Sequence, residues 1–247
     1  MSTFLKTAIA AAALAMMPMA AQAAAPTVSI VSFTANQSGP NLTYADNGAA
    51  GWTLGTVTPK AVLVTLEDFD GNFQSGIAAN LSFAGTGTSF AQNTIGDLWS
   101  QHFTGGTVSF TSTAAFTLGS TVYAAGSNIL SLTFIGGEMS ARVPGTAGNA
   151  LVSIPGDSFS NVSSDFLSFP PTQLTDFSIS LANVIPGFCI GSCGIGGQAA
   201  VRFQNFTARG SGDFTATVPE PSTWAMLLLG FGMVGFAARR RQVAAAA

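Results

Sequence analysis

The sequence predicts an all-β body, an antiparallel β-sandwich or jelly roll, between an N-terminal signal peptide helix and a C-terminal transmembrane helix. Three observations predict the body. Short runs of alternating apolar and small polar residues recur through the middle of the chain, which is typical of strands with one buried face. Turn dipeptides separate these runs, and helical periodicity is almost absent. The 20 Phe among 247 residues provide large inward-facing side chains for a core.

The N-terminal 23 residues have the parts of a secretory signal peptide. Lys6 is their only charge, an apolar run follows it, and the stretch ends in Ala21-Gln22-Ala23. We expect cleavage after Ala23, with Ala25 as a near alternative. Export then requires the Sec translocon and signal peptidase as partners.

Residues 26–218 are expected to form a single β-sandwich body. Two stretches are expected to be irregular because they contain glycine or proline. Asn161 to Pro171 is expected to form a long loop between sheets, and Ser211 to Val218 the passage from the last strand into the tail. The clearest expected strands are 28–33, 61–66, 108–110, 129–134, 177–181, 201–208 and 214–218. The expected turns include Asn47-Gly48, Asp70-Gly71, Gly105-Gly106, Gly136-Gly137, Pro144-Gly145, Pro155-Gly156 and Pro186-Gly187.

The charge composition excludes several classes of protein. Only 8% of residues are charged, against roughly 25% in ordinary globular proteins, which excludes a coiled coil and a charged disordered chain. Residues 26–218 contain four basic residues against ten Asp and Glu, so nucleic acid is not expected as a partner. The surface is instead expected to be polar and uncharged.

The C-terminal region has the features of a membrane-spanning signal. Residues 221–238 carry no charge, and a helix of that length would measure about 27 Å, just enough to cross a bilayer. Trp224 lies at one end of this span and Arg239, Arg240 and Arg241 at the other, which places residues 242–247 in the cytoplasm and the body outside it. Both ends of the chain therefore predict export of the body.

The segment from Val218 to Arg241 resembles the PEP-CTERM sorting signal in its PEPxxWA variant. The resemblance rests on Pro219-Glu220-Pro221, then Trp224 and Ala225, a glycine-containing span and the arginine cluster, Arg239 to Arg241. It covers about a tenth of the chain. Such tails are also catalogued as the C-terminal domain of ice-binding proteins, a label that is no evidence of ice binding. The resemblance implies processing by an inner-membrane exosortase, often alongside exopolysaccharide production, which makes extracellular polysaccharide a candidate partner.

Two short motifs have a structural and a chemical interpretation. Cys189 and Cys193, the only cysteines, are expected to form a local disulfide in an oxidising compartment, with free thiols as the alternative. Asp68, Asp70 and Asn72 place oxygen ligands at alternate positions, as in a calcium loop, but Ala79 stands where the acidic twelfth ligand would be. An Asp-Gly hairpin turn explains the same residues. We expect no metal and no cofactor.

We therefore expect an exported, non-enzymatic protein of the cell surface or extracellular matrix. The first alternative is a carbohydrate-binding module that stacks sugars on exposed aromatic rings, for which Tyr44, Trp52, Trp99 and Tyr123 are the candidates. The second is an exported hydrolase. It would use His102, the sole histidine, or two facing carboxylates from among Asp68, Asp70, Asp97, Asp157, Asp165 and Asp176.

Overall fold

The computed structural model describes residues 27–68, 71–143, 150–167, 174–190 and 202–217, together with residue 231. Residues 27–218 form one compact unit. Its first eight strands are β1 (Thr27–Ala35), β2 (Leu42–Asp46), β3 (Trp52–Gly55), β4 (Lys60–Glu67), β5 (Phe73–Gly87), β6 (Gln92–Ile95), β7 (Leu98–His102) and β8 (Gly105–Ser112). The remaining elements are β9 (Phe116–Leu118), β10 (Thr121–Tyr123), β11 (Asn128–Phe134), β12 (Glu138–Arg142), β13 (Ala150–Pro155), β14 (Phe159–Ser163), β15 (Leu174–Ile185) and β16 (Phe206–Thr217), with 3-10 turns η1 (Gly48–Ala50) and η2 (Gly156–Ser158).

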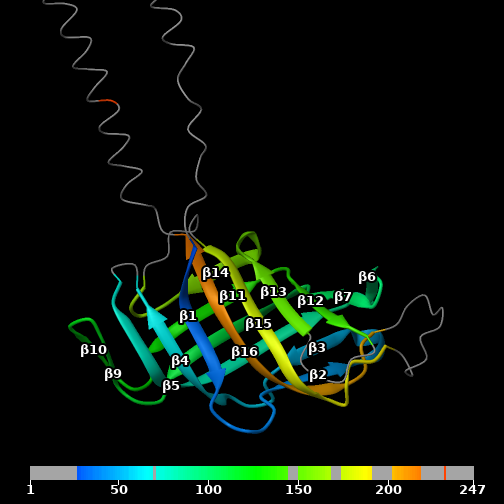
Figure 1. Ribbon diagram of the computed structural model, residues 1–247, viewed down its shortest axis with the longest axis horizontal. Coiled ribbons are helices and arrows are strands. Elements are labelled where there is room, and N and C mark those ends of the chain that lie inside the picture. The colour runs from blue at the N-terminus through cyan, green and yellow to red at the C-terminus, as the bar shows by residue number, and fades with distance from the viewer. Residues whose placement is uncertain are drawn as a thin grey trace, which may run out of the picture. The chain divides into compact units, whose positions relative to one another are not determined.

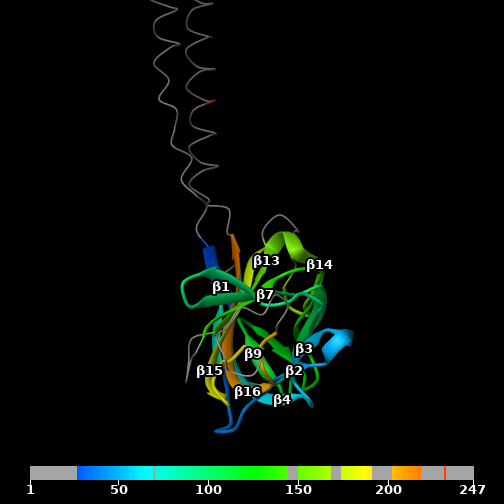
Figure 2. The ribbon, with the colours of Figure 1, turned by 90° about the vertical axis from the view of Figure 1, so that its right-hand side faces the viewer.

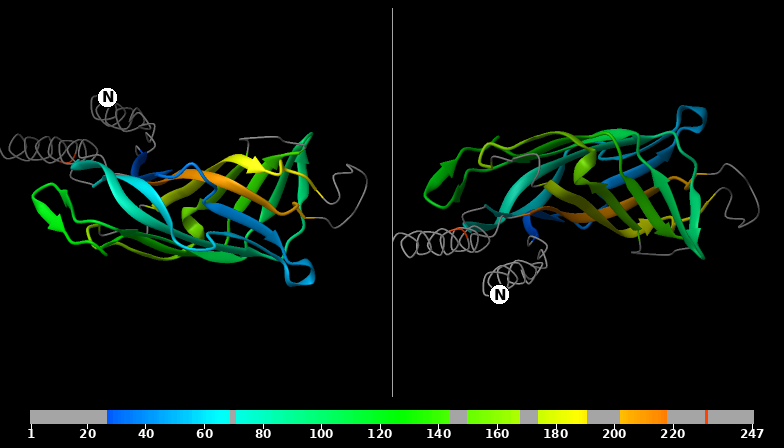
Figure 3. Two further views of the ribbon diagram at one scale, coloured as in Figure 1. Left: turned by 90° about the horizontal axis from the view of Figure 1, so that it is seen from below. Right: turned by 90° about the horizontal axis from the view of Figure 1, so that it is seen from above.

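The all-β antiparallel sandwich is confirmed (Figure 1). Fourteen strands share one hydrogen-bonded network, and β9 and β10 form a separate hairpin. Strands β14, β11, β8 and β5 make one layer, and β16, β15, β13, β12, β7 and β6 make the other. Two strand pairs connect the layers, β1 with β4 and β2 with β3. In each pair one strand also pairs with β5 (β4 and β3) and the other with β16 (β1 and β2). Figure 2 shows the strands from the right-hand side of Figure 1, and Figure 3 shows them from below and from above.

The core between the layers is rich in phenylalanine, as the composition predicted. Alternation along β5 and β16 turns every second side chain inward. Across the layers, the ring centroids of Phe33 and Phe110 are 5.0 Å apart, and those of Phe159 and Phe214 are 5.6 Å apart. Aromatic contacts of this kind stabilise beyond their burial by about 0.5–1.5 kcal/mol each. The core therefore gains directional contacts as well as apolar burial.

Two of the expected glycine turns are instead points where strands run from one layer into the other. Phe134 lies opposite Gly106, and Glu138 lies opposite His102, so the register continues without a shift from the β11–β8 pair into the β12–β7 pair. Gly106 therefore lies in a strand. A Cβ there would overlap the carbonyl oxygen of Ala84 and the ring of Phe134. Glycine is required at this position because the backbones and the core ring approach too closely for a side chain.

The expected division of the last strand is also wrong. Residues 206–217 form one strand, where the sequence predicted one strand ending at 208, another beginning at 214 and a passage to the tail. A Cβ on Gly212 would overlap the carbonyl oxygen of Ser178, and one on Gly210 would lie 2.6 Å from Leu42 Cδ1. These glycines permit close strand packing, and sequence alone could not distinguish that use from a turn.

The expected loop at 161–171 is wrong at its start. Residues 159–163 form β14, which pairs with β11, so Asn161 lies opposite Thr133 in a strand. The turn η2 at 156–158 links β13 to β14 and carries the chain from one layer to the other. Pro170 and Pro171 lie outside the described residues.

Candidate functional site

The outward surface of β7, β12, β13, β15 and β16 presents a row of polar side chains. The cross-strand register places His102 opposite Glu138, Glu138 opposite Ser153, Ser153 opposite Ser178, and Ser178 opposite Asp213. Successive side chains of a strand point to opposite faces, so the residues next to this row in sequence point inward. Met139, Val152 and Ile179 are such neighbours, and all three are buried. The composition predicted an uncharged polar surface, but this row combines two serine hydroxyls with two carboxylates and an imidazole.

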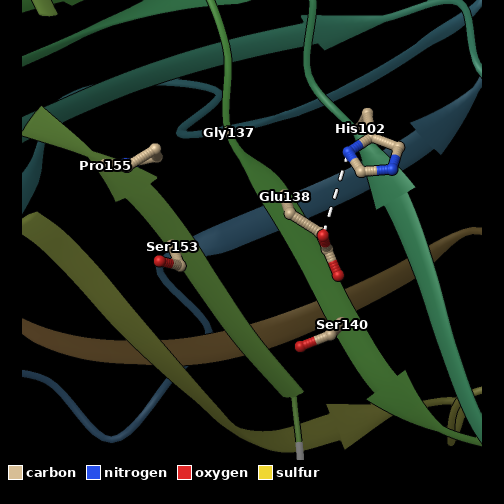
Figure 4. A pocket seen from close by; sticks show the side chains of 6 residues that line it. All are labelled: His102, Gly137, Glu138, Ser140, Ser153 and Pro155. Carbon is tan, nitrogen blue, oxygen red and sulfur yellow. Dashed lines mark ion pairs between the residues drawn. The ribbon is translucent and has the colours of Figure 1, made fainter. Parts of the chain in front are cut away.

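A shallow hollow of about 390 Å³ lies in this face, close to the positions where β7, β12 and β13 continue into the other layer. Its lining residues are His102, Gly137, Glu138, Ser140, Ser153 and Pro155, shown in Figure 4. Gly137, at the start of the hollow, has φ of +133°, a conformation that L side chains rarely adopt. The backbone therefore requires glycine here, and a Cβ would also lie 3.0 Å from the Ser153 carbonyl oxygen.

The ionisable groups of the hollow are His102 and Glu138. Nδ1 of His102 lies 3.8 Å from Oε2 of Glu138, and the two side chains are 53% and 41% exposed. Figure 4 shows them pointing toward each other from neighbouring strands. At that distance the pair is an electrostatic contact and not a hydrogen bond, so both groups keep hydrogen-bonding capacity for a ligand.

A pair of carboxylates adjoins the hollow along the same face. The Ser153 hydroxyl donates to Asp176 Oδ1 at 3.2 Å, and the Ser178 hydroxyl donates to Asp213 Oδ1 at 2.7 Å. Burial raises the pKa of Asp176 above its ordinary value, the Ser153 hydrogen bond opposes the rise, and the negative charge of Asp213 adds to it. This edge of the hollow is therefore a region of negative potential.

The aromatic platform expected for sugar stacking is not formed by Tyr44 and Trp52. Both rings are buried, at 0% and 1% exposure, and they stack on each other with centroids 5.6 Å apart. The Tyr44 hydroxyl donates to Gln101 Oε1 at 3.1 Å, and burial raises the Tyr44 pKa. Trp99 and Tyr123 are partly buried and pack against the core. The first alternative therefore loses Tyr44 and Trp52 as exposed rings.

His102 and the carboxylates proposed for a hydrolase are arranged as follows. No serine hydroxyl in the described residues hydrogen-bonds the His102 imidazole; Ser89 contacts only the His102 backbone. Asp97 is held by Arg142, whose Nη1 lies 2.6 Å from Asp97 Oδ1, and this hydrogen bond lowers the Asp97 pKa. Asp165 accepts from the backbone of Asn128 at 2.7 Å.

The candidate calcium loop contains a turn held by its own side chains. Both Asp68 carboxylate oxygens accept from Asn72, one from its backbone N and one from its side-chain Nδ2, each at 2.8 Å. Gly71 donates to the Asp68 carbonyl at 3.1 Å with φ of +80°. Asp70 lies outside the described residues. The hairpin-turn interpretation therefore accounts for Asp68, Gly71 and Asn72.

The cysteine pair is only half described. Cys189 is 8% exposed, and its carbonyl accepts from the backbone of Gln204 at 2.9 Å. Cys193 lies outside the described residues, and the disulfide between them stays a prediction.

Arg202 is a residue whose importance the sequence analysis missed. Its side chain is only 8% exposed, and its guanidinium donates to the carbonyls of Gly48 at 2.6 Å and Thr88 at 3.1 Å. Asp46 lies 3.3 Å away, and the Phe90 ring centroid is 4.6 Å from the guanidinium carbon. The only signal in the sequence is an arginine within a stretch almost free of charge.

The signal regions lie outside the described residues: the signal peptide with Ala21 and Ala23, and the tail with Pro219 to Pro221, Trp224, Ala225 and Arg239 to Arg241. Among the residues that the structure does describe, no helix has the length and apolarity needed to cross a membrane. The expected span at 221–238 is represented there by Phe231 alone.

Comparison with protein families identifies the C-terminal signal, which lies outside the described residues. Residues 217–241 match the family model of the PEP-CTERM protein-sorting motif. No curated protein and no solved structure matches the chain. The fold and the motif together define an exported all-β protein with a C-terminal sorting signal. More particularly, the chain carries the PEP-CTERM motif, so it is made as a membrane-anchored precursor that an exosortase sorts.

Proposed function

We propose that the processed protein is a non-enzymatic component of the cell surface or extracellular matrix, associated with exopolysaccharide. The observation that carries this proposal is the sorting motif attached to a rigid body whose acidic side chains are largely engaged with the body itself. Asp46, Asp97, Asp165, Asp176 and Asp213 all accept hydrogen bonds from neighbouring residues. Groups bound in this way hold strands and loops together and are less available for proton transfer.

The surface chemistry supports a role in a hydrated polymer matrix. Serine and threonine hydroxyls both donate and accept hydrogen bonds, so a face made of them suits contact with water and with hydroxyl-rich chains alike. The sparse charge makes such contacts less sensitive to salt than a charged surface would be. A hydroxyl-rich face attached to an export signal is consistent with a matrix protein.

The sorting part of the proposal is tested by replacing Pro219, Glu220 and Pro221 with alanine in the full chain, expressed in an exosortase-containing host. We expect an unprocessed precursor in the membrane fraction, because the substitutions remove the residues that define the sorting motif, including two prolines, which as a residue type favour an extended, unpaired backbone. A matched control replaces Ser222 and Thr223, which the PEPxxWA pattern leaves free, and should be processed normally. Normal release of the triple variant would contradict the proposed role of these residues.

The matrix part is tested by fractionation. The processed protein should co-sediment with the exopolysaccharide of the host and should appear in the soluble medium in a strain that makes no exopolysaccharide. An unchanged distribution between the two strains would contradict the association, while leaving the sorting result intact.

A further inference from the structure

The hollow on the β7–β12–β13 face contains polar groups that the body does not satisfy. Within the described part of the chain, no hydrogen bond reaches the Glu138 carboxylate or the Ser140 hydroxyl, and the nearest charged partner of Glu138 is His102 at 3.8 Å. Elsewhere on the same sheet face, Asp213 accepts from Ser178 at 2.7 Å. Glu138 therefore differs from its neighbours in being available to a ligand.

The lining combines hydrogen-bonding groups with apolar borders. The Glu138 carboxylate only accepts, the Ser140 hydroxyl donates and accepts, and the His102 imidazole does one or both according to its protonation. Along β13 the outward side chains are Leu151, Ser153 and Pro155, and Leu151 is 43% exposed directly opposite Ser140. The hollow is thus polar at its centre and bordered on one side by the apolar ring of Pro155.

A sugar ring has matching properties. Adjacent hydroxyls of a pyranose donate together to one carboxylate, and hydrogen bonds to an ionised acceptor are roughly twice as strong as neutral ones. The C–H surface of the ring would contact the Pro155 side chain and remove apolar area from water. The few directed polar groups in a concave surface are what orient a small ligand.

Charge around the hollow discriminates between sugars. Asp176 adjoins it through Ser153, and the exposed Asp157 lies two residues beyond Pro155. The basic residue on β12, Arg142, is four positions beyond Glu138 and is already bound to Asp97. A uronate would meet these carboxylates together with Glu138, and His102 is the one lining residue that could oppose their charge, so a neutral sugar is favoured.

We propose that this hollow is a binding site for a neutral sugar unit with vicinal hydroxyls, held mainly by the Glu138 carboxylate with Ser140 and His102 beside it. The inference rests on the proposed matrix role, because a neutral stretch of extracellular polysaccharide would be the natural source of such a unit. Binding by the purified protein is nevertheless measured without reference to sorting.

The test uses the full chain in a zwitterionic detergent, since a detergent with a sugar headgroup would compete. The probes are the methyl glycosides of mannose, galactose and glucose, with methyl glucuronide as the charged counterpart, titrated by saturation-transfer NMR. We expect saturable binding of at least one neutral glycoside, and binding of the glucuronide at least about tenfold weaker than that of the glucoside if glucose is bound.

Variants assign the binding to the hollow. Glu138→Gln should weaken it by about tenfold or more, the loss expected for one charge-assisted hydrogen bond. Ser140→Ala should weaken it by a smaller factor. The matched control Glu67→Gln, on β4, removes the same charge away from the hollow and should bind as the unaltered chain does. The tryptophan fluorescence melting curves of all three variants should coincide with that of the unaltered chain.

Three results would overturn the proposal: no saturable binding of any neutral glycoside, equal binding by Glu138→Gln, or saturation by calcium chloride in place of the glycosides. The third would identify a cation site. Failure here leaves the processing of the triple-alanine variant unaffected, so the two proposals fail separately.

Discussion

Replacing Arg202 with methionine should destabilise the body strongly. The guanidinium donates hydrogen bonds to the carbonyl oxygens of Gly48, Thr88 and Ser89, at 2.6, 3.1 and 3.3 Å. The Arg202 side chain is 8% exposed. Methionine keeps an apolar stem but removes every donor and the guanidinium that lies 4.6 Å from the Phe90 ring centroid. The turn after β2 and the segment after β5 would then lose their common partner.

The magnitude follows from the number of bonds and their burial. A hydrogen bond to a charged group contributes about 1.5–3 kcal/mol, and breaking a buried, multiply bonded charge costs about 3–5 kcal/mol in all, because contributions are not additive. We expect a loss of unfolding free energy of about 3–5 kcal/mol. Arg202→Lys keeps the charge but not the planar fork, so it should recover less than half of that loss.

The assay is urea unfolding of the full chain in detergent, followed by tryptophan fluorescence, because Trp52 is buried in the body. The control is Arg209→Met, which removes a guanidinium with one hydrogen bond, from Nη2 to the Ala35 carbonyl at 2.8 Å. It should cost about 1.5–3 kcal/mol. If Arg202→Met costs no more than Arg209→Met, then the three carbonyl contacts do not act together and the reasoning is refuted.

Three further predictions concern other parts of the body. Gly106→Ala should destabilise by about 1–3 kcal/mol because its Cβ overlaps Ala84 and Phe134; Gly39→Ala, in open space, is the control, and equal unfolding curves would contradict the close approach. Asp176→Asn should stabilise at neutral pH, since a carboxyl whose pKa is raised on folding costs stability once pH exceeds the folded pKa. That gain should vanish below the unfolded pKa of about 4, and a gain independent of pH would contradict the assignment to ionisation. Finally, alkylation of the exported protein without reductant should leave its mass unchanged if Cys189 and Cys193 are bonded, whereas two added labels would refute the disulfide.

The strand pattern illustrates how far local sequence information reaches. The expected strands at 61–66, 129–134 and 177–181 all lie inside observed strands, because burial of alternate side chains is a local property of each segment. The sequence predicted a turn at Gly105-Gly106 and a passage to the tail from Ser211 onward, whereas the structure places Gly105-Gly106 and residues 211–217 in strands. A glycine pair has the same composition whether it forms a turn or lets two backbones approach.

The candidate site was only partly accessible from sequence. His102 was singled out because it is the sole histidine, but Glu138, Ser140 and Ser153 were not connected to it. Together with His102 they come from three strands, whose register depends on pairing between residues as distant in sequence as Arg142 and Leu98. Arg202 was overlooked for the same reason, since its carbonyl partners lie more than a hundred residues earlier in the chain.

The sequence by itself determined the export route and the layered β class of this protein. Both are written in short contiguous patterns: the PEP-CTERM motif and alternation with a period of two. Only the tertiary structure decided which aromatic rings are buried, which glycines lie in strands, and which carboxylate remains free in a hollow. The physical reason is that exposure and hydrogen bonding depend on what distant segments place beside a residue, and a local pattern carries no information about that neighbour.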